Sequence, residues 1–236
     1  MQVTEVNVEA YDVDSLRKMV RILEYINIYL ITGRNCYLID SGVAGSEILI
    51  EEYLRSIGRK ISDIKGIFLT HSHPDHTGAA AEIKRQTGCR IYAPRQEIPW
   101  IENVRKQFEE RPIPNFFRLL PESVKVDQPL KDGDVIEPEE GILLRALSTP
   151  GHSHGSMCYI LNRDTIFTGD AIPETKDFPI AVDLEESIRS LDRLRSLTGI
   201  RCGCPAWDHV YTDKEWKDVL AERREMLFKK KEAAAE

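Results

Sequence analysis

The segment HSHPDH at residues 71–76 constrains what this chain can fold into more than any other part of the sequence. It contains three histidines and an aspartate, and it directly follows the short apolar run 66–70, which is typical of a strand. Imidazole nitrogens and carboxylate oxygens are ligands that suit zinc and iron in proteins. The sequence therefore predicts a fold that places a metal site at the end of this strand.

The spacing within the segment indicates how its side chains are divided. Alternate residues of an extended segment point the same way, so His71 and His73 can bind one metal. Pro74 disfavours a continued helix and turns the chain. After that turn, Asp75 and His76 can bind a second metal.

Three further ligand candidates lie far from this segment along the chain. His152 lies in the turn-rich run 149–155, between two expected strands. Asp170 follows the apolar run 166–169, where a strand is expected to end, and His209 follows the last expected strand. We expect His154 to face solvent, with a contact to a metal ligand as the alternative. For Tyr211 we favour packing over proton donation to a leaving group.

Short β-rich runs alternate with amphipathic stretches through the rest of the chain. We expect strands at 3–8, 26–31, 35–40, 66–70, 90–93, 141–147, 156–161, 164–168 and 201–205. We expect helices at 47–57 and 78–87, a helix opened by the capping residue Asp183, and a terminal helix at 213–231. Two β-rich halves, each with helices, suggest an α+β fold in the form of a four-layer αββα sandwich.

The segment 97–139 breaks this alternation. It contains the aromatic residues Trp100, Phe108, Phe116 and Phe117, with three prolines around them. A long connection with its own aromatic residues can cover a site as a lid or pocket wall, or it can be a helical insertion that simply packs on the sheets. We interpret residues 1–236 as a single domain that carries this insertion.

Charge and cysteine content narrow the class of protein. A formal net charge of −7 argues against a nucleic-acid partner, because phosphate contacts require a basic surface. Five cysteines without paired spacing predict buried, reduced thiols, and Cys202 and Cys204 would face the same side of a strand. We see neither a signal peptide nor an apolar run of membrane-spanning length, so we expect a cytoplasmic protein with no membrane partner.

The ligand pattern as a whole resembles that of the metallo-β-lactamase superfamily, from residue 40 to His209. This resemblance implies the αββα sandwich, with two divalent metal ions, zinc by preference and iron or manganese as alternatives, at one edge between the halves. It implies that Asp40 orients the loop that carries the segment 71–76, and that Asp170 bridges the metals. It also implies two ligand sets, which are His71, His73 and His152 for the first metal and Asp75, His76 and His209 for the second.

The chemistry that the resemblance implies is hydrolysis. Two divalent cations about 3.5–4 Å apart lower the pKa of a bridging water and give hydroxide near neutral pH. Asp75 is the catalytic candidate, placed to orient this nucleophile or accept its proton.

The ligand pattern with aspartate at position 170 is most similar to that of glyoxalase II-type thioesterases and lactonases. Many β-lactamases of this fold carry cysteine at the position of Asp170. We therefore expect a small-molecule ester, thioester or lactone as substrate. The alternatives are a mononuclear iron dioxygenase acting on persulfides and a phosphodiesterase, and a metal-binding module without activity is a third reading. The oligomeric state stays open, a homo-oligomer included.

Overall fold

The computed structural model describes residues 26–111, 121–172 and 181–234. The chain divides into two compact units. We call residues 1–130 and 138–141 the N-terminal unit, and residues 131–137 and 142–236 the C-terminal unit.

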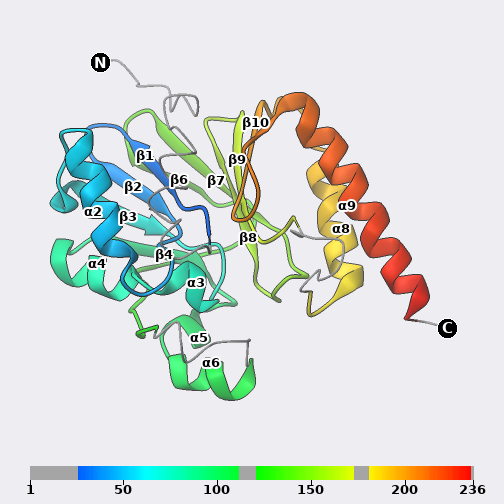
Figure 1. Cartoon of the computed structure of the whole chain (residues 1–236), viewed down its shortest axis with the longest axis horizontal. Coiled ribbons are helices and arrows are strands. Elements are labelled where there is room, and N and C mark those ends of the chain that lie inside the picture. The colour runs from blue at the N-terminus through cyan, green and yellow to red at the C-terminus, as the bar shows by residue number, and fades with distance from the viewer. Residues whose placement is uncertain (1–25, 112–120, 173–180, 235–236) are drawn as a thin grey trace. The chain divides into compact units, whose positions relative to one another are not determined.

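The N-terminal unit contains a five-stranded mixed sheet in the order β1-β2-β3-β4-β5 (Figure 1). Its strands are β1 (Tyr29–Thr32), β2 (Cys36–Ile39), β3 (Ile64–Phe68), β4 (Arg90–Pro94) and β5 (Gln128–Leu130). β1 and β2 pair antiparallel, and the other neighbouring strands pair parallel. The carboxyl ends of β2, β3 and β4 therefore meet at one edge of this sheet, which is where α/β proteins place their ligands.

The helices of this unit are α2 (Ser46–Ser56), α3 (Pro74–Thr77), α4 (Ala80–Thr87), α5 (Ile98–Ile101) and α6 (Val104–Glu110), with a 3-10 turn at Ile61–Asp63. Ile50 and Leu54 on α2 and Ile83 on α4 are buried, which is the apolar stripe expected of a helix that packs on a sheet. The chain leaves β2 through Asp40, whose φ of 59° is the left-handed conformation that aspartate and asparagine tolerate best after glycine.

The C-terminal unit contains a six-stranded sheet in the order β11-β10-β9-β8-β7-β6. Its strands are β6 (Val135–Glu139, whose last two residues belong to the N-terminal unit), β7 (Ile142–Ser148), β8 (Met157–Leu161), β9 (Thr165–Gly169), β10 (Cys202–Pro205) and β11 (Tyr211–Thr212). β9 and β10 pair parallel, whereas β7, β8 and β9 pair antiparallel in turn.

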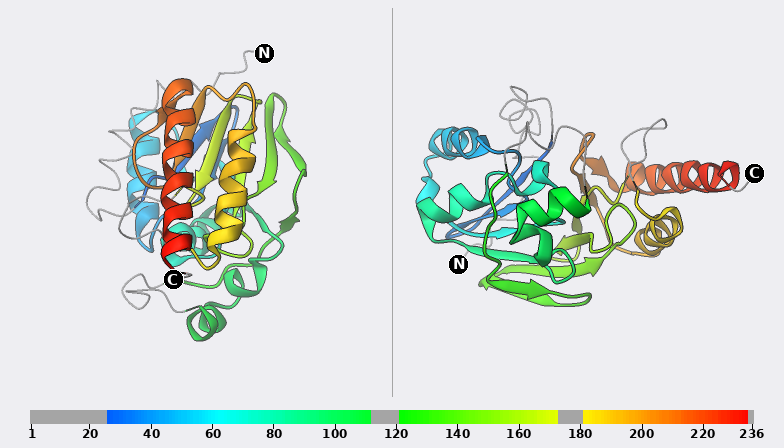
Figure 2. Two further views of the ribbon diagram at one scale, coloured as in Figure 1. Left: turned by 90° about the vertical axis from the view of Figure 1, so that its right-hand side faces the viewer. Right: turned by 90° about the horizontal axis from the view of Figure 1, so that it is seen from below.

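Helices α8 (Leu184–Arg195) and α9 (Asp213–Ala233) run side by side against this sheet (Figure 2, left). Leu191 from α8 and Trp216 and Leu220 from α9 pack with the strands in one buried apolar cluster. Gly203 on β10 is needed for this packing, because a Cβ at that position would collide with the Trp216 ring.

Most of the expected elements are present, with ends shifted by at most three residues. Asp183 caps α8 as predicted, and its carboxylate accepts a hydrogen bond from the Glu186 backbone N–H at 2.9 Å. The expected strand at 3–8 and the aromatic residues Phe116 and Phe117 lie outside the described residues. Within 97–139, the helices α5 and α6 agree with the alternative of a helical insertion, whereas the strands β5 and β6 were not anticipated.

All five cysteines are free thiols, as the sequence predicted. Four are buried, and Cys202 is half-buried. The Cys202 and Cys204 sulfurs lie 3.8 Å apart, so the two side chains do face the same side of β10.

Candidate metal centre

The metal loop of the N-terminal unit, residues 69–77, follows the carboxyl end of β3. Its three imidazoles, His71, His73 and His76, are all buried. Their rings are packed together, with the His71 centroid 4.5 Å from that of His73 and 4.0 Å from that of His76. Pro74 occupies the first turn of α3, where a proline does not cost a helical hydrogen bond. The chain thus turns at Pro74 as expected, by starting a short helix.

A buried network fixes the rings of His71 and His76. Asp40 accepts hydrogen bonds from the Thr70 backbone N–H at 2.8 Å, from the Thr70 hydroxyl at 2.8 Å and from His76 Nδ1 at 2.8 Å. Because the Thr70 hydroxyl donates its one proton to Asp40, it must accept from His71 Nδ1, which lies 3.0 Å away.

The same contacts settle the tautomers of these two histidines. A carboxylate and an already donating hydroxyl can only accept, so both rings carry their proton on Nδ1. In the neutral form of His71 and of His76 the lone pair then lies on Nε2, the atom with which each ring can bind a metal. Asp75 adds a carboxylate 3.8 Å from His76 Nε2, and its side chain is 16% exposed.

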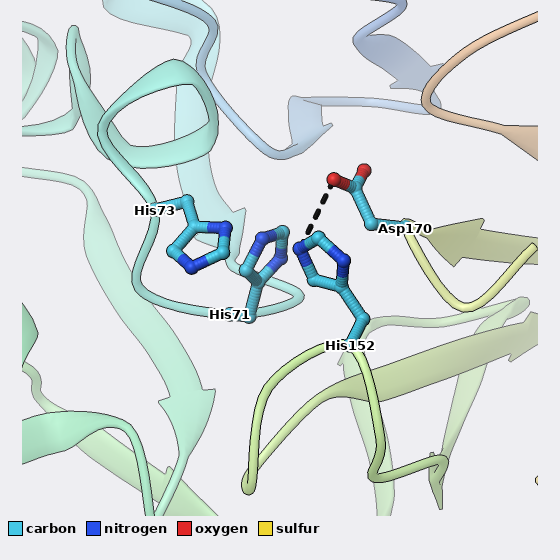
Figure 3. A group of neighbouring side chains, drawn as sticks. All are labelled: His71, His73, His152 and Asp170. Carbon is cyan, nitrogen blue, oxygen red and sulfur yellow. Dashed lines mark ion pairs between the residues drawn. The ribbon is translucent and has the colours of Figure 1, made fainter. Parts of the chain in front are cut away.

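In the C-terminal unit, His152 and Asp170 lie together. His152 Nε2 is 3.2 Å from Asp170 Oδ2, and the Trp207 indole donates to Asp170 Oδ1 at 3.1 Å. His152 lies in the loop after β7, next to Gly151, where a Cβ would collide with Ser187. Figure 3 shows this ion pair, and it shows His71 and His73 side by side on the metal loop.

His209 is placed differently. It pairs with its neighbour Asp208 through Nδ1 at 2.7 Å, and its side chain is 49% exposed. The Tyr211 hydroxyl donates to the other oxygen of Asp208 at 2.9 Å. Within the C-terminal unit, therefore, the structure joins His152 to Asp170 and joins His209 to Asp208.

The chemistry of these donors fits a divalent metal of the zinc type. Each residue drawn in Figure 3 offers one imidazole nitrogen or carboxylate oxygen as a ligand atom. Two ligand atoms of a tetrahedral zinc with bonds of about 2.0–2.2 Å lie roughly 3.3 Å apart. The separation of 3.2 Å between His152 Nε2 and Asp170 Oδ2 is compatible with that spacing, and it equally allows the direct ion pair described above.

The sequence did not single out Thr70, Glu97 or Gln107, although Thr70 contacts His71 within the metal loop and the other two contact Ser72. Threonine, glutamate and glutamine are common surface residues, so their types alone carry no signal. The one available hint was position, because Thr70 and Glu97 follow the ends of neighbouring parallel strands.

Comparison with known proteins identifies the class to which this fold and these residues belong. The family model described as "Metallo-beta-lactamase superfamily" matches residues 21–199. The chain belongs to the metallo-beta-lactamase superfamily, which confirms the resemblance seen in the sequence. The expected fold class is confirmed with it.

Individual relatives carry hydrolase names. An atrochrysone carboxyl ACP thioesterase of Aspergillus fumigatus is 31% identical over 83% of this chain and 54% of its own length. A probable metallo-hydrolase of Methanocaldococcus jannaschii is 32% identical over 71% of this chain and 80% of its own. A probable polyketide biosynthesis zinc-dependent hydrolase of Bacillus velezensis is 30% identical over 71% of this chain and 64% of its own. The chain spans about half the length of the fungal relatives it matches.

Solved structures share the fold. A metallo-beta-lactamase family protein of Thermus thermophilus superposes with a TM-score of 0.70 at 23% identity, over 88% of this chain and 76% of its own. The subclass B3 metallo-beta-lactamase of Bradyrhizobium japonicum gives a TM-score of 0.72 at 23% identity, over 90% of both chains. Across the three described stretches of the chain, no helix is both long and apolar enough to cross a membrane.

Proposed function

We propose that this chain is a metal-dependent hydrolase in which the ligands of the two units act together as one centre for two divalent metal ions. The observation that carries the proposal is the spacing of the His152–Asp170 pair, which suits two ligands of one zinc ion. The fixed tautomers of His71 and His76 support it from the other unit. Zinc is the preferred ion, since the Bacillus velezensis relative is named as zinc-dependent.

The seven candidate ligands divide into two sets and a bridge. The first ion would be held by His71, His73 and His152, the second by Asp75, His76 and His209, with Asp170 between them. When bound, such ions lower the pKa of a coordinated water to near neutrality.

Asp75 is the proposed catalytic residue. Its carboxylate is partly exposed, whereas the imidazole of His76 beside it is fully buried. An exposed carboxylate oxygen can orient a water molecule and accept its proton, and a buried imidazole with a fixed tautomer cannot exchange protons as readily.

We propose a thioester, ester or lactone as the substrate, and a thioester first. The name of the fungal relatives, which are ACP thioesterases, supports this choice. Asp170 supports it as well, because a hard carboxylate at this position is the pattern of the thioesterase and lactonase branches noted above.

The first experiment is elemental analysis of the purified protein, followed by turnover of a panel of thioesters, lactones, phosphodiesters and β-lactams. We expect two zinc ions per chain and hydrolysis of thioesters or lactones. One iron ion per chain together with oxygen uptake would contradict this proposal and favour the persulfide dioxygenase. Preferred cleavage of phosphodiesters would contradict the proposed substrate class.

The Asp170→Ala variant tests the bridging role. We expect it to lose at least one metal ion per chain and most of the turnover, because its carboxylate would be shared by both ions. Asp164→Ala is the matched control, since Asp164 lies just before the other end of β9. Wild-type activity in Asp170→Ala would overturn the bridging assignment.

A further inference from the structure

Glu97 is a buried carboxylate at the start of the segment 97–139, three residues after the end of β4. It is fully inaccessible to solvent. A buried carboxylate is costly unless hydrogen bonds and an opposite charge compensate for its lost hydration. The contacts of Glu97 therefore indicate what this residue is for.

Those contacts are with the metal loop and with the end of α6. Glu97 Oε2 accepts a hydrogen bond from the Ser72 backbone N–H at 3.2 Å and from the Ser72 hydroxyl at 2.6 Å. The Arg111 guanidinium pairs with the same oxygen at 3.1 Å. That guanidinium also lies over the Trp100 ring, 3.3 Å from its centroid, so the segment itself holds the cation in place.

Gln107 on α6 contacts the remaining polar group of Ser72. This side chain is buried, and its amide donates to the Ser72 carbonyl at 2.5 Å. The N–H, the hydroxyl and the carbonyl of Ser72 are thus all bonded to Glu97 or Gln107.

Ser72 is the residue between the ligand candidates His71 and His73. Two of the three bonded polar groups of Ser72 are its backbone N–H and carbonyl. The hydrogen bonds from Glu97 and Gln107 therefore fix the orientation of the backbone between the two imidazoles. That orientation sets the direction in which the two imidazoles project, and ligand direction governs metal affinity.

We propose that Glu97 and Gln107 are positioning residues for the metal, and that the helical part of the segment 97–139 supports the metal loop through Ser72. This inference rests on the proposed metal centre and assigns the segment a role in metal binding. It predicts that metal affinity depends on side chains that are not ligands.

The test compares metal binding by Glu97→Ala, Glu97→Gln and Gln107→Leu. Affinity is measured by competition with a chelator, and the ligand field by the visible absorption spectrum of the cobalt-substituted protein. We expect about 10- to 100-fold weaker binding and a changed spectrum for Glu97→Ala and Gln107→Leu. Glu97→Gln keeps an oxygen that can accept from Ser72, so its loss should be smaller than that of Glu97→Ala.

Glu109→Gln is the matched control. Glu109 lies on the same helix as Gln107, is exposed, and pairs with Arg105 at 2.9 Å. We expect its metal affinity and cobalt spectrum to equal those of the wild type. If the substitutions acted by destabilising α6 in general, Glu109→Gln would also lower the metal affinity. If they act by releasing Ser72, Glu109→Gln leaves the metal affinity unchanged.

The outcomes separate this inference from the proposed function. If the wild-type protein binds no metal, the proposed function fails. If the wild type binds metal and Glu97→Ala and Gln107→Leu bind it equally well with the same cobalt spectrum, the positioning role is wrong. Should Glu97→Ala not fold, Gln107→Leu and Ser72→Ala give the same readout, because each removes one bond to Ser72.

Discussion

Each unit pairs a carboxylate with Nδ1 of a candidate metal-binding histidine. In the N-terminal unit, Asp40 lies 2.8 Å from His76, with side chains 3% and 0% exposed. In the C-terminal unit, Asp208 lies 2.7 Å from His209, with side chains 35% and 49% exposed. The two distances differ by only 0.1 Å, so the two pairs differ mainly in their burial and in the partners around them.

The partners decide how much freedom each imidazole has. Around Asp40, the Thr70 N–H can only donate, and water has no access to replace a lost bond. Around Asp208, the Tyr211 hydroxyl can donate or accept, and solvent reaches the pair. Burial raises the pKa of Asp208, but the hydrogen bonds from His209 and Tyr211 outweigh it and hold the pKa below its usual value. The same pairing should therefore be indispensable in one unit and dispensable in the other.

The largest effect is expected from Asp40→Asn. Asparagine tolerates the positive φ at this position, so the backbone can stay as it is. Its oxygen can still accept from the Thr70 N–H, and its NH₂ group then faces His76 Nδ1. His76 must accept there and carry its proton on Nε2, which removes the lone pair that would bind metal.

We expect about 10- to 100-fold weaker metal binding by Asp40→Asn in the chelator competition. The free energy of unfolding should fall by about 1.5–3 kcal/mol, the range for hydrogen bonds to a charged group. Asp63→Asn is the control, because Asp63 is a half-buried aspartate of the same unit that caps the 3-10 turn and, among the described residues, pairs with no histidine. Unchanged metal affinity in Asp40→Asn would mean that the Nδ1 contact does not set the tautomer.

A smaller effect is expected from the same substitution at the other pair, Asp208→Asn. The retained oxygen still accepts from His209 Nδ1, and the NH₂ group can donate to the Tyr211 hydroxyl. Because the pair is exposed, we expect a loss of less than about 1 kcal/mol in stability and nearly wild-type metal affinity. A loss of metal affinity in Asp208→Asn as large as that in Asp40→Asn would contradict this expectation. It would mean that burial does not determine how much each pair contributes to metal binding.

The ligand candidates could be predicted because their signal is local. Three histidines and an aspartate in the segment 71–76 identify a metal loop without knowledge of any tertiary contact. The strands beside them are short, apolar and buried, so their pattern is also local. Asp40 was found only through the family resemblance, since a single aspartate after a strand is an ordinary turn residue.

The support of the metal loop could not be predicted from local pattern. Glu97 meets Ser72 across 25 residues, and Gln107 meets it across 35. Strand β5 was missed for a related reason, because it has three residues, one of them a proline, and forms through its pairing with β4. In both cases the structure depends on tertiary contacts, and the local hydrophobic pattern of the sequence does not indicate it.

An effect on stability alone is expected at a carboxylate of intermediate burial, Glu139 in the N-terminal unit. It accepts hydrogen bonds from the backbone N–H groups of Arg34 at 2.6 Å and Asn35 at 3.0 Å, and from the Tyr37 hydroxyl at 3.2 Å. Burial raises the pKa of Glu139, but these hydrogen bonds outweigh it, so its pKa lies below the ordinary value of 4.5.

The sign of the pH dependence follows from that direction. A carboxylate with a lowered pKa in the folded state stabilises the fold above its ordinary pKa, and this contribution is lost as the pH falls through the folded-state value. Glu139→Gln should therefore lose about 1 kcal/mol at pH 7 and show a flatter decline in stability below pH 4.5. Denaturant unfolding from pH 7 to pH 3 measures both, with the exposed neighbour Glu140→Gln as control. If Glu139→Gln and Glu140→Gln give the same pH profile, the hydrogen bonds to Glu139 add no more to stability than an exposed carboxylate does. The difference between Asp40 and Asp208 would then have to come from burial alone.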